Sequence, residues 1–183
     1  MAPLGVVWWI AGGWALDLHL GRQTREHADI DVGVARRDHL RVQSLLACEW
    51  QLFKAHQSCL APWPAAEELR EPVHDVWARR DERSPWAFQL MLVEVRDGLW
   101  IYRRLPEIRL PLAEVLAGSR DGVPYLRPEV QLLYKGGSSS RRPRDLEDLR
   151  RMLPALSAAQ VAWLRASLAR QFPHGHKWLA ELG

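Results

Sequence analysis

The hydrophobic pattern at the start of the chain predicts a strand, a tight turn and a short helix. Apolar side chains fill residues 6–11, a length typical of a buried strand. Gly12 and Gly13 follow, and residues 14–20 then have the composition of a short helix. Gly21 marks its end, because glycine readily adopts the left-handed conformation found after a helix.

A second apolar run shows the alternation of a strand that is buried on one face. Ile30, Val32 and Val34 occupy every second position and are expected to anchor this strand in a core. Asp29 and Asp31 project from the other face, with their Cα atoms roughly 6.5 to 7 Å apart. Two carboxylates so placed can converge on one cation, although an Asp-x-Asp also occurs at solvated strand ends.

The remaining pattern divides the chain into an α/β core and a helical region. In the core we expect a helix at residues 38–47, a strand at 50–53, a loop at 58–72, strands at 73–79 and 87–95, and an edge strand at 100–103. From residue 106 onward the pattern favours helices separated by Pro and Gly. One begins at Pro128 and ends at Gly136, another starts near Arg144, and Ser157 caps the last. The predicted units are therefore residues 1–105 and 106–183.

Composition narrows the class of protein. The 183 residues carry a formal net charge of +3 and a pI near 9.2, a mildly basic balance that helps to attract ATP without arguing for nucleic acid. Cys48 and Cys59 give neither a disulfide framework nor a zinc pattern, so a reducing cytoplasm is the expected location. No run of about 18 apolar residues predicts a membrane span, and no basic segment precedes residues 6–20 as it would in a signal peptide.

The acidic pair and the glycine pair together indicate a nucleotide site. Oxygen ligands without neighbouring Cys or His suit Mg²⁺, which is usually completed by water and substrate phosphates. Gly12 and Gly13 allow close approach of a ligand, and the N–H groups at a helix start attract phosphate. An ordinary tight turn is the alternative explanation for the glycines.

These motifs resemble a known family. The segment GGWALDLHLGRQTREHADIDV is similar to the aminoglycoside and lincosamide adenylyltransferases, a branch of the polymerase β-like nucleotidyltransferases. PEVQLLYK and RPRDLEDL, near residues 124–148, match the same family. The resemblance implies an α/β (α+β) fold, with a mixed sheet and a C-terminal helical part. It also implies that Asp29 and Asp31 hold Mg²⁺ and that Gly12 and Gly13 face the triphosphate of ATP. Family members often begin with a helix before the first strand, so the resemblance leads us to expect a truncated or divergent start.

Three further residues match the family and are candidate phosphate-binding groups. Arg25 and His27 are expected to hold the triphosphate or to orient the acidic pair; solvation of the loop is the alternative. Lys135 is expected to reach the β- or γ-phosphate while Asp145 and Asp148 orient it or pack the helical part against the core. The alternative for Lys135 is a solvated cation at a helix C-terminus.

The family needs a third carboxylate, and this chain departs from the family pattern at the position where relatives often carry it. Relatives often place it in the strand FQLMLVE, where this chain has Gln89 and Met91. If the two strands pair as a hairpin about residue 82, Asp75 lies opposite Gln89 on the same face. We therefore expect Asp75 to act as the base or second metal ligand, with Glu94 as its competitor. Both acids are otherwise ordinary surface groups.

Tryptophans surround the predicted sheet, and their rings suit stacking on adenine or on a sugar, although large aromatic residues also fill cores. They are Trp63, Trp77, Trp86 and Trp100. Arg103, Arg104 and Arg109 form a basic group that either contacts an anion or is solvated.

The predicted reaction is Mg²⁺-dependent transfer of AMP from ATP to a hydroxyl of a small acceptor, such as an aminoglycoside or a related antibiotic. One alternative is a toxin–antitoxin-type nucleotidyltransferase that modifies protein or RNA. Another is a catalytically inactive nucleotide-binding module. An elongated basic groove would favour RNA, and an acidic pocket would favour a cationic aminoglycoside.

Overall fold

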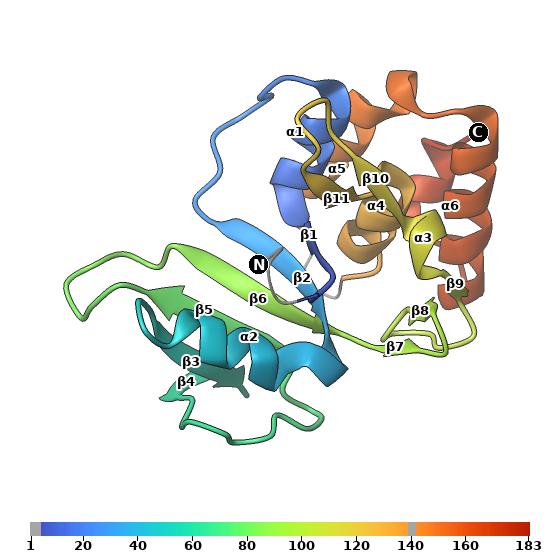
Figure 1. Ribbon diagram of the computed structural model, residues 1–183. Helices are drawn as coiled ribbons and strands as arrows, with labels where there is room; N and C mark the ends of the chain where they lie inside the picture. Colours follow the sequence, from blue (N-terminus) through green and yellow to red (C-terminus); the bar gives the residue numbers. More distant parts are fainter. Residues whose placement is uncertain (1–4, 139–141) are drawn as a thin grey trace.

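The computed structural model describes residues 5–138 and 142–183, and its centre is a mixed eight-stranded sheet (Figure 1). The strand order is β10-β11-β1-β2-β6-β5-β3-β4, and a small second sheet has the order β7-β8-β9. The strands are β1 (Trp8–Ile10), β2 (Ile30–Ala35), β3 (Gln51–His56), β4 (Cys59–Pro62), β5 (Asp75–Arg79), β6 (Phe88–Val93), β7 (Val95–Arg96), β8 (Leu99–Ile101), β9 (Arg109–Pro111), β10 (Leu116–Gly118) and β11 (Pro124–Leu126). The α-helices are α1 (Gly12–Leu20), α2 (His39–Leu46), α3 (Leu112–Val115), α4 (Pro128–Gly136), α5 (Pro143–Met152) and α6 (Ala158–Gln171). Short 3₁₀ helices are η2 (Arg36–Asp38), η3 (Leu153–Ala155) and η4 (Lys177–Ala180).

The alternation of side chains along β2 gives the sheet two different faces. Val32 and Val34 point to one face, where they are 7% and 0% exposed, and they pack in a core with Leu90 of β6 and Val42 of α2. Helix α2 lies over this part of the sheet (Figure 1). Ile30 was expected to join this core but is 42% exposed, because it is the first residue of β2 and lies at the end of that strand.

The opposite face is covered in part by the C-terminal helices. Trp9 of β1 packs there in a second core with Leu132 and Leu133 of α4 and Leu164 of α6, all of them buried. Figure 1 shows α4, α5 and α6 gathered at this end of the molecule. The rest of this face, over β2, β6 and β5, borders an open cavity.

The predicted fold class is confirmed, and most predicted elements are present. Helix α4 begins with Pro128 at its first turn, and α6 begins with a capping box in which Ser157 and Gln160 bond each other's backbone N–H groups. The boundary at residue 105 stays a prediction. Strands from both sides of it share the large sheet, since β11 pairs with β1.

Three predictions of secondary structure were wrong. Strand β4 lies within the expected loop at 58–72, because Gln57 and Ser58 take positive φ angles and close a hairpin without the usual Asn-Gly signal. Strands β9, β10 and β11 lie in the region expected to be helical, and three residues are too few to show a period. Strand β8 is central in its sheet rather than at the edge, since β9 pairs with it from further along the chain.

Within the described residues, no helix combines the length and the apolar character that crossing a membrane requires.

Candidate active site

An open cavity of about 440 Å³ lies between the uncovered sheet face and the helical region. Its walls come from the start of α1, the start of β2 and the segment before it, strands β5 and β6, the segment after β8, helix α4 and the start of α5. Among the residues that the sequence singled out, the cavity is lined by Gly12, Gly13, Arg25, His27, Asp29, Asp31, Trp77, Gln89, Met91, Arg103, Arg104, Lys135 and Asp145. Residues more than 100 positions apart are thereby brought together.

Asp29 and Asp31 face this cavity together, as the strand alternation predicts. Asp31 lies opposite Gln89 on the neighbouring parallel strand. Burial raises the pKa of Asp31 to about 6; the negative charges of Asp29 and Asp75 also raise it, while Lys135 lowers it. Like charges held this close favour a bound cation.

The donor set at this point fits a magnesium ion with few protein ligands. The part of the chain that the structure describes contains no group of three or more His, Cys, Asp or Glu side chains arranged to hold a metal. Two carboxylates, completed by water and substrate phosphate, are the arrangement that Mg²⁺ commonly takes. Asp29 and Asp31 are therefore the residues that would hold the ion.

Gly12 and Gly13 make room for the acidic pair and for the loop before β2. Gly12 has a φ of +66°, and a Cβ on it would lie 1.9 Å from Oδ2 of Asp31. A Cβ on Gly13 would lie 2.3 Å from the His27 ring. The N–H of Gly12 donates to Oε1 of Gln131 over 2.7 Å, so a side chain of α4 accepts the hydrogen bond that we had expected to go to phosphate.

Asp17 of α1 anchors the loop that carries His27. Its two carboxylate oxygens lie 2.6 Å from Nε2 of His27 and 2.6 Å from Oγ1 of Thr24, which donates to it. The His27 and Asp17 side chains are only 4% and 3% exposed, and the His27 ring lies 4.6 Å from that of Trp14. His27 thus borders the cavity while it ties the loop to the helix.

Lys135 stands in a network of buried charges that links the loop to helices α4 and α5. Its Nζ lies 2.9 Å from Oδ1 of Asp145 and 2.9 Å from Oδ2 of Asp148. Arg25 donates to both oxygens of Asp148, over 3.2 and 3.3 Å. Burial alone would raise the pKa of Asp148, but hydrogen bonds from Arg25 and Lys135 outweigh it and hold this pKa below its ordinary value. The network fixes the lysine ammonium at the cavity wall.

The structure separates the two candidates for the third carboxylate. Asp75 pairs with Met91 rather than with Gln89, so the hairpin is centred on residue 83 instead of 82. The expected face is nevertheless correct, and Nε2 of Gln89 donates to Oδ1 of Asp75 over 2.8 Å. Neither acid lines the cavity itself. Asp75 is hydrogen-bonded to Gln89, which does line it, whereas Glu94 follows β6 and pairs with Arg36.

Four further arginines among the described residues line the cavity, and the sequence anticipated two of them, Arg103 and Arg104. Arg103 and Arg104 line the cavity, and Nη1 of Arg104 donates to the Tyr134 carbonyl over 2.9 Å. Arg142 and Arg144, at the start of α5, line it too. Arg109 was grouped with them but is exposed on β9, outside the cavity. No local pattern in the sequence marks which arginines face inward.

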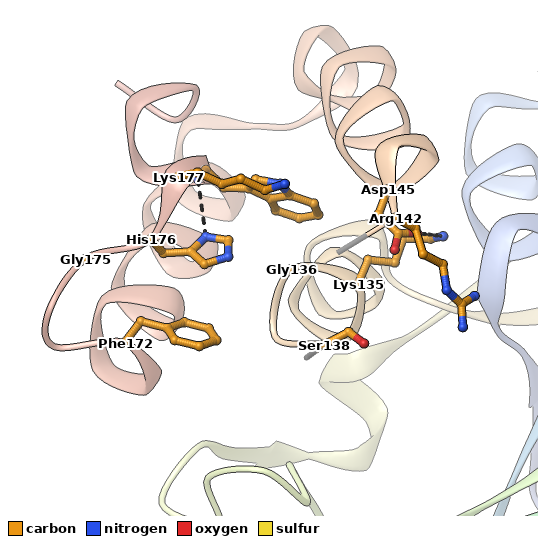
Figure 2. A pocket seen from close by; sticks show the side chains of 10 residues that line it. Lys135, Gly136, Ser138, Arg142, Asp145, Phe172, Gly175, His176 and Lys177 are labelled. Atoms are coloured by element: carbon orange, nitrogen blue, oxygen red, sulfur yellow. Dashed lines mark hydrogen bonds and ion pairs between the residues drawn. The ribbon is translucent and has the colours of Figure 1, made fainter. Parts of the chain in front are cut away.

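A smaller hollow of about 210 Å³ adjoins the cavity and shares Lys135, Ser138, Arg142 and Asp145 with it. Figure 2 shows Lys135, Arg142 and Asp145 on one side of this hollow and Phe172 and His176 on the other. The Phe172 and His176 rings are stacked, with centroids 4.8 Å apart.

Comparison with known proteins gives a sequence match over the start of the chain and a fold match over most of it. Residues 1–52 match the family model described as aminoglycoside-2''-adenylyltransferase. No curated protein sequence matches the chain.

The solved structures that resemble it include two of the antibiotic-resistance factor ANT(2'')-Ia. The solution structure has a TM-score of 0.62 at 18% identity and covers 94% of this chain and 87% of its own. The crystal structure with adenylyl-2''-tobramycin has a TM-score of 0.59 at 16% identity, covering 93% and 91%. The lincomycin-bound lincosamide antibiotic adenylyltransferase LnuA has a TM-score of 0.55 at 20% identity, covering 81% and 87%. The chain therefore has the nucleotidyltransferase fold of these antibiotic-modifying proteins, and its first 52 residues match the sequence pattern of the aminoglycoside-2''-adenylyltransferase family.

Proposed function

We propose that the protein is a Mg²⁺-dependent nucleotidyltransferase that transfers AMP from ATP to a hydroxyl group of a small antibiotic. The observation that carries this proposal is the position of Asp29 and Asp31, side by side in one cavity with Lys135. The match of residues 1–52 and the fold shared with antibiotic adenylyltransferases support the same reaction.

In this reaction the acceptor oxygen bonds to the α-phosphorus of ATP. The bond from that phosphorus to the oxygen bridging to the β-phosphorus breaks, and pyrophosphate leaves with the electron pair. A magnesium ion at Asp29 and Asp31 supplies neutralisation of the phosphate charge when it is bound. Lys135, oriented by its two aspartates, holds the β- or γ-phosphate as a point charge.

Asp75 is the group that accepts the proton of the acceptor hydroxyl. The hydrogen bond from Gln89 orients Oδ1 of Asp75. The negative charge of Asp75 also contributes to the raised pKa of Asp31. The base therefore comes from β5 instead of β6. This arrangement argues against the inactive nucleotide-binding module, which the loss of an acid at positions 89 and 91 had suggested.

The test is transfer of label from α-labelled ATP to tobramycin or lincomycin in the presence of Mg²⁺. Asp29→Asn and Asp31→Asn are expected to abolish transfer, because each removes a metal ligand while conserving size. Asp121→Asn, at an exposed position away from the cavity, is the matched control and should retain activity. Transfer that survives both cavity substitutions would refute the metal assignment.

A further inference from the structure

The part of the cavity that would receive the acceptor lies outside the segment matched by the family model. That match ends at residue 52, whereas Trp77 and Gln89, which line the cavity, and Asp75, which is hydrogen-bonded to Gln89, come from β5 and β6. The sequence match therefore covers the glycines and the acidic pair. It does not cover the cavity wall on β5 and β6, whose shape and charge determine which acceptor fits.

Among the aromatic side chains on the described strands of the sheet, that of Trp77 lines the cavity. It lies on β5 two residues from Asp75, opposite Gln89, and so shares the face that carries the proposed base. Trp77 is only partly buried, which leaves part of its side chain available to a ligand.

Other aromatic residues contact this ring and each other beside it. Trp86 meets Trp77 edge to face, with centroids 6.0 Å apart, and Phe53 meets Trp86 in the same way at 5.3 Å. The guanidinium of Arg79 lies over both supporting rings, 4.8 Å from Phe53 and 5.0 Å from Trp86. Because these contacts already restrict the Trp77 ring, it loses little conformational entropy when a ligand stacks on it.

The charges of the wall disfavour an acceptor with many positive charges. Lys135 and Arg25 are neutralised by Asp145 and Asp148, and Asp29 and Asp31 are taken by the metal in the proposed reaction.

The remaining charged groups of the described wall are mainly arginines. Arg103, Arg104, Arg142 and Arg144 line the cavity. Asp75 lies beside the wall, next to Gln89, and already has Arg103 at 4.0 Å. Apart from the phosphates of ATP, a polycation would thus meet like charge without compensating carboxylates among the described residues.

We propose that the acceptor is an uncharged or singly charged glycoside whose sugar ring stacks on Trp77. This inference rests on the proposed function and narrows its substrate class. The apolar C–H face of a sugar packs on an aromatic ring while its hydroxyl edge stays polar, and Asp75, two residues along the strand, then receives the proton of the hydroxyl that takes AMP from ATP. Pyrophosphate is the leaving group, as in the reaction above.

The experiment measures initial rates with lincomycin, a glycoside with a single basic amine, and with tobramycin, a polycation, at saturating ATP and Mg²⁺. The wild-type protein should have the higher kcat/KM for lincomycin. Trp77→Ala should raise the KM for lincomycin about tenfold, since stacking contributes to binding equally before and during the reaction. The KM for ATP should stay unchanged, and Trp77→Phe should restore most of the loss.

Trp50→Ala is the matched control. Trp50 also forms an edge-to-face pair, with Phe88 at 4.9 Å, and also carries an arginine, Arg80, over its ring, but it does not line the cavity. It should therefore leave the KM for lincomycin unchanged, whatever it does to stability. Phe172→Ala tests the adjoining hollow as a rival acceptor site.

Three results would overturn the inference while leaving the proposed function intact. They are a higher kcat/KM for tobramycin than for lincomycin, an effect of Trp77→Ala no larger than that of Trp50→Ala, and a rise in acceptor KM in Phe172→Ala but not in Trp77→Ala. Absence of AMP transfer and of pyrophosphate release with both acceptors would instead refute the proposed function itself.

Discussion

Replacing Gly12 by alanine should damage both the stability and the activity of the protein. A Cβ at this position would lie 1.9 Å from Oδ2 and 2.8 Å from Cγ of Asp31, so the carboxylate has to move away from its place in the cavity. The φ of +66° adds strain, because residues with a side chain rarely adopt it. Gly21, at the other end of α1, has the same φ of +66° but open space around it.

The two glycines therefore separate the cost of the backbone angle from the cost of the clash. Left-handed backbone costs an L-residue about 1–2 kcal/mol, which is the whole loss expected for Gly21→Ala. Overpacking adds about 1–3 kcal/mol at Gly12, so Gly12→Ala should lose about 2–5 kcal/mol. The smaller entropy of the unfolded chain affects both variants alike and cancels in their difference.

Urea unfolding followed by circular dichroism measures the two free energies of unfolding, and AMP transfer measures activity. Because displacement of a catalytic group by about 1 Å can reduce the rate about a hundredfold, Gly12→Ala should lose most of its activity. Gly21→Ala should keep its activity. Equal stability losses in the two variants, or full activity in Gly12→Ala, would refute the close approach of Gly12 to Asp31.

Three further predictions follow from the charged groups. Lys135→Ala should lower the free energy of unfolding by about 3–5 kcal/mol, since two buried aspartates lose their shared cation. Arg151→Ala, whose side chain is 41% exposed near one of them, should change it by no more than about 0.5 kcal/mol in the same urea titration. The pKa of Asp148 is lower in the folded protein than in the unfolded chain, where it is about 4. Its ionised form therefore stabilises the fold above that unfolded pKa, and this stability is lost as the pH falls through the folded pKa. The Tm of Asp148→Asn should accordingly decline less steeply with acid than that of the wild type, and parallel curves would contradict the shift. Asp75→Asn should lower kcat about a hundredfold or more while Glu94→Gln leaves it unchanged, and the reverse result in rate assays would assign the base to Glu94.

The parts of the site that are contiguous in sequence could be predicted from it. Asp31 lies on β2 and Asp29 directly before it, so their common side follows from the period of two in extended chain. Gly12 is recognisable because only a turn separates its strand from its helix. Lys135 and its aspartates were suggested by family resemblance, and the structure then showed their contacts.

The parts that depend on long connections could not be predicted in detail. The register of β5 against β6 depends on the loop between them, where Asp81 accepts hydrogen bonds from the N–H groups of Arg83 and Ser84. With this turn Asp75 pairs with Met91, two residues from the expected Gln89, and its side chain stays on the expected face of the sheet. Arg103 and Arg142 reach the cavity from separate elements, and side-chain type alone does not say which arginines point inward.

The most direct test of the account is the effect of Mg²⁺ on the binding of a non-hydrolysable ATP analogue, measured by calorimetry. We expect the wild-type protein to bind the analogue at least about tenfold more tightly with Mg²⁺ than with a chelator, because the ion joins the phosphates to Asp29 and Asp31. The Asp29→Asn, Asp31→Asn double variant should bind it equally weakly in both conditions. An unchanged magnesium effect in that variant would contradict the central claim.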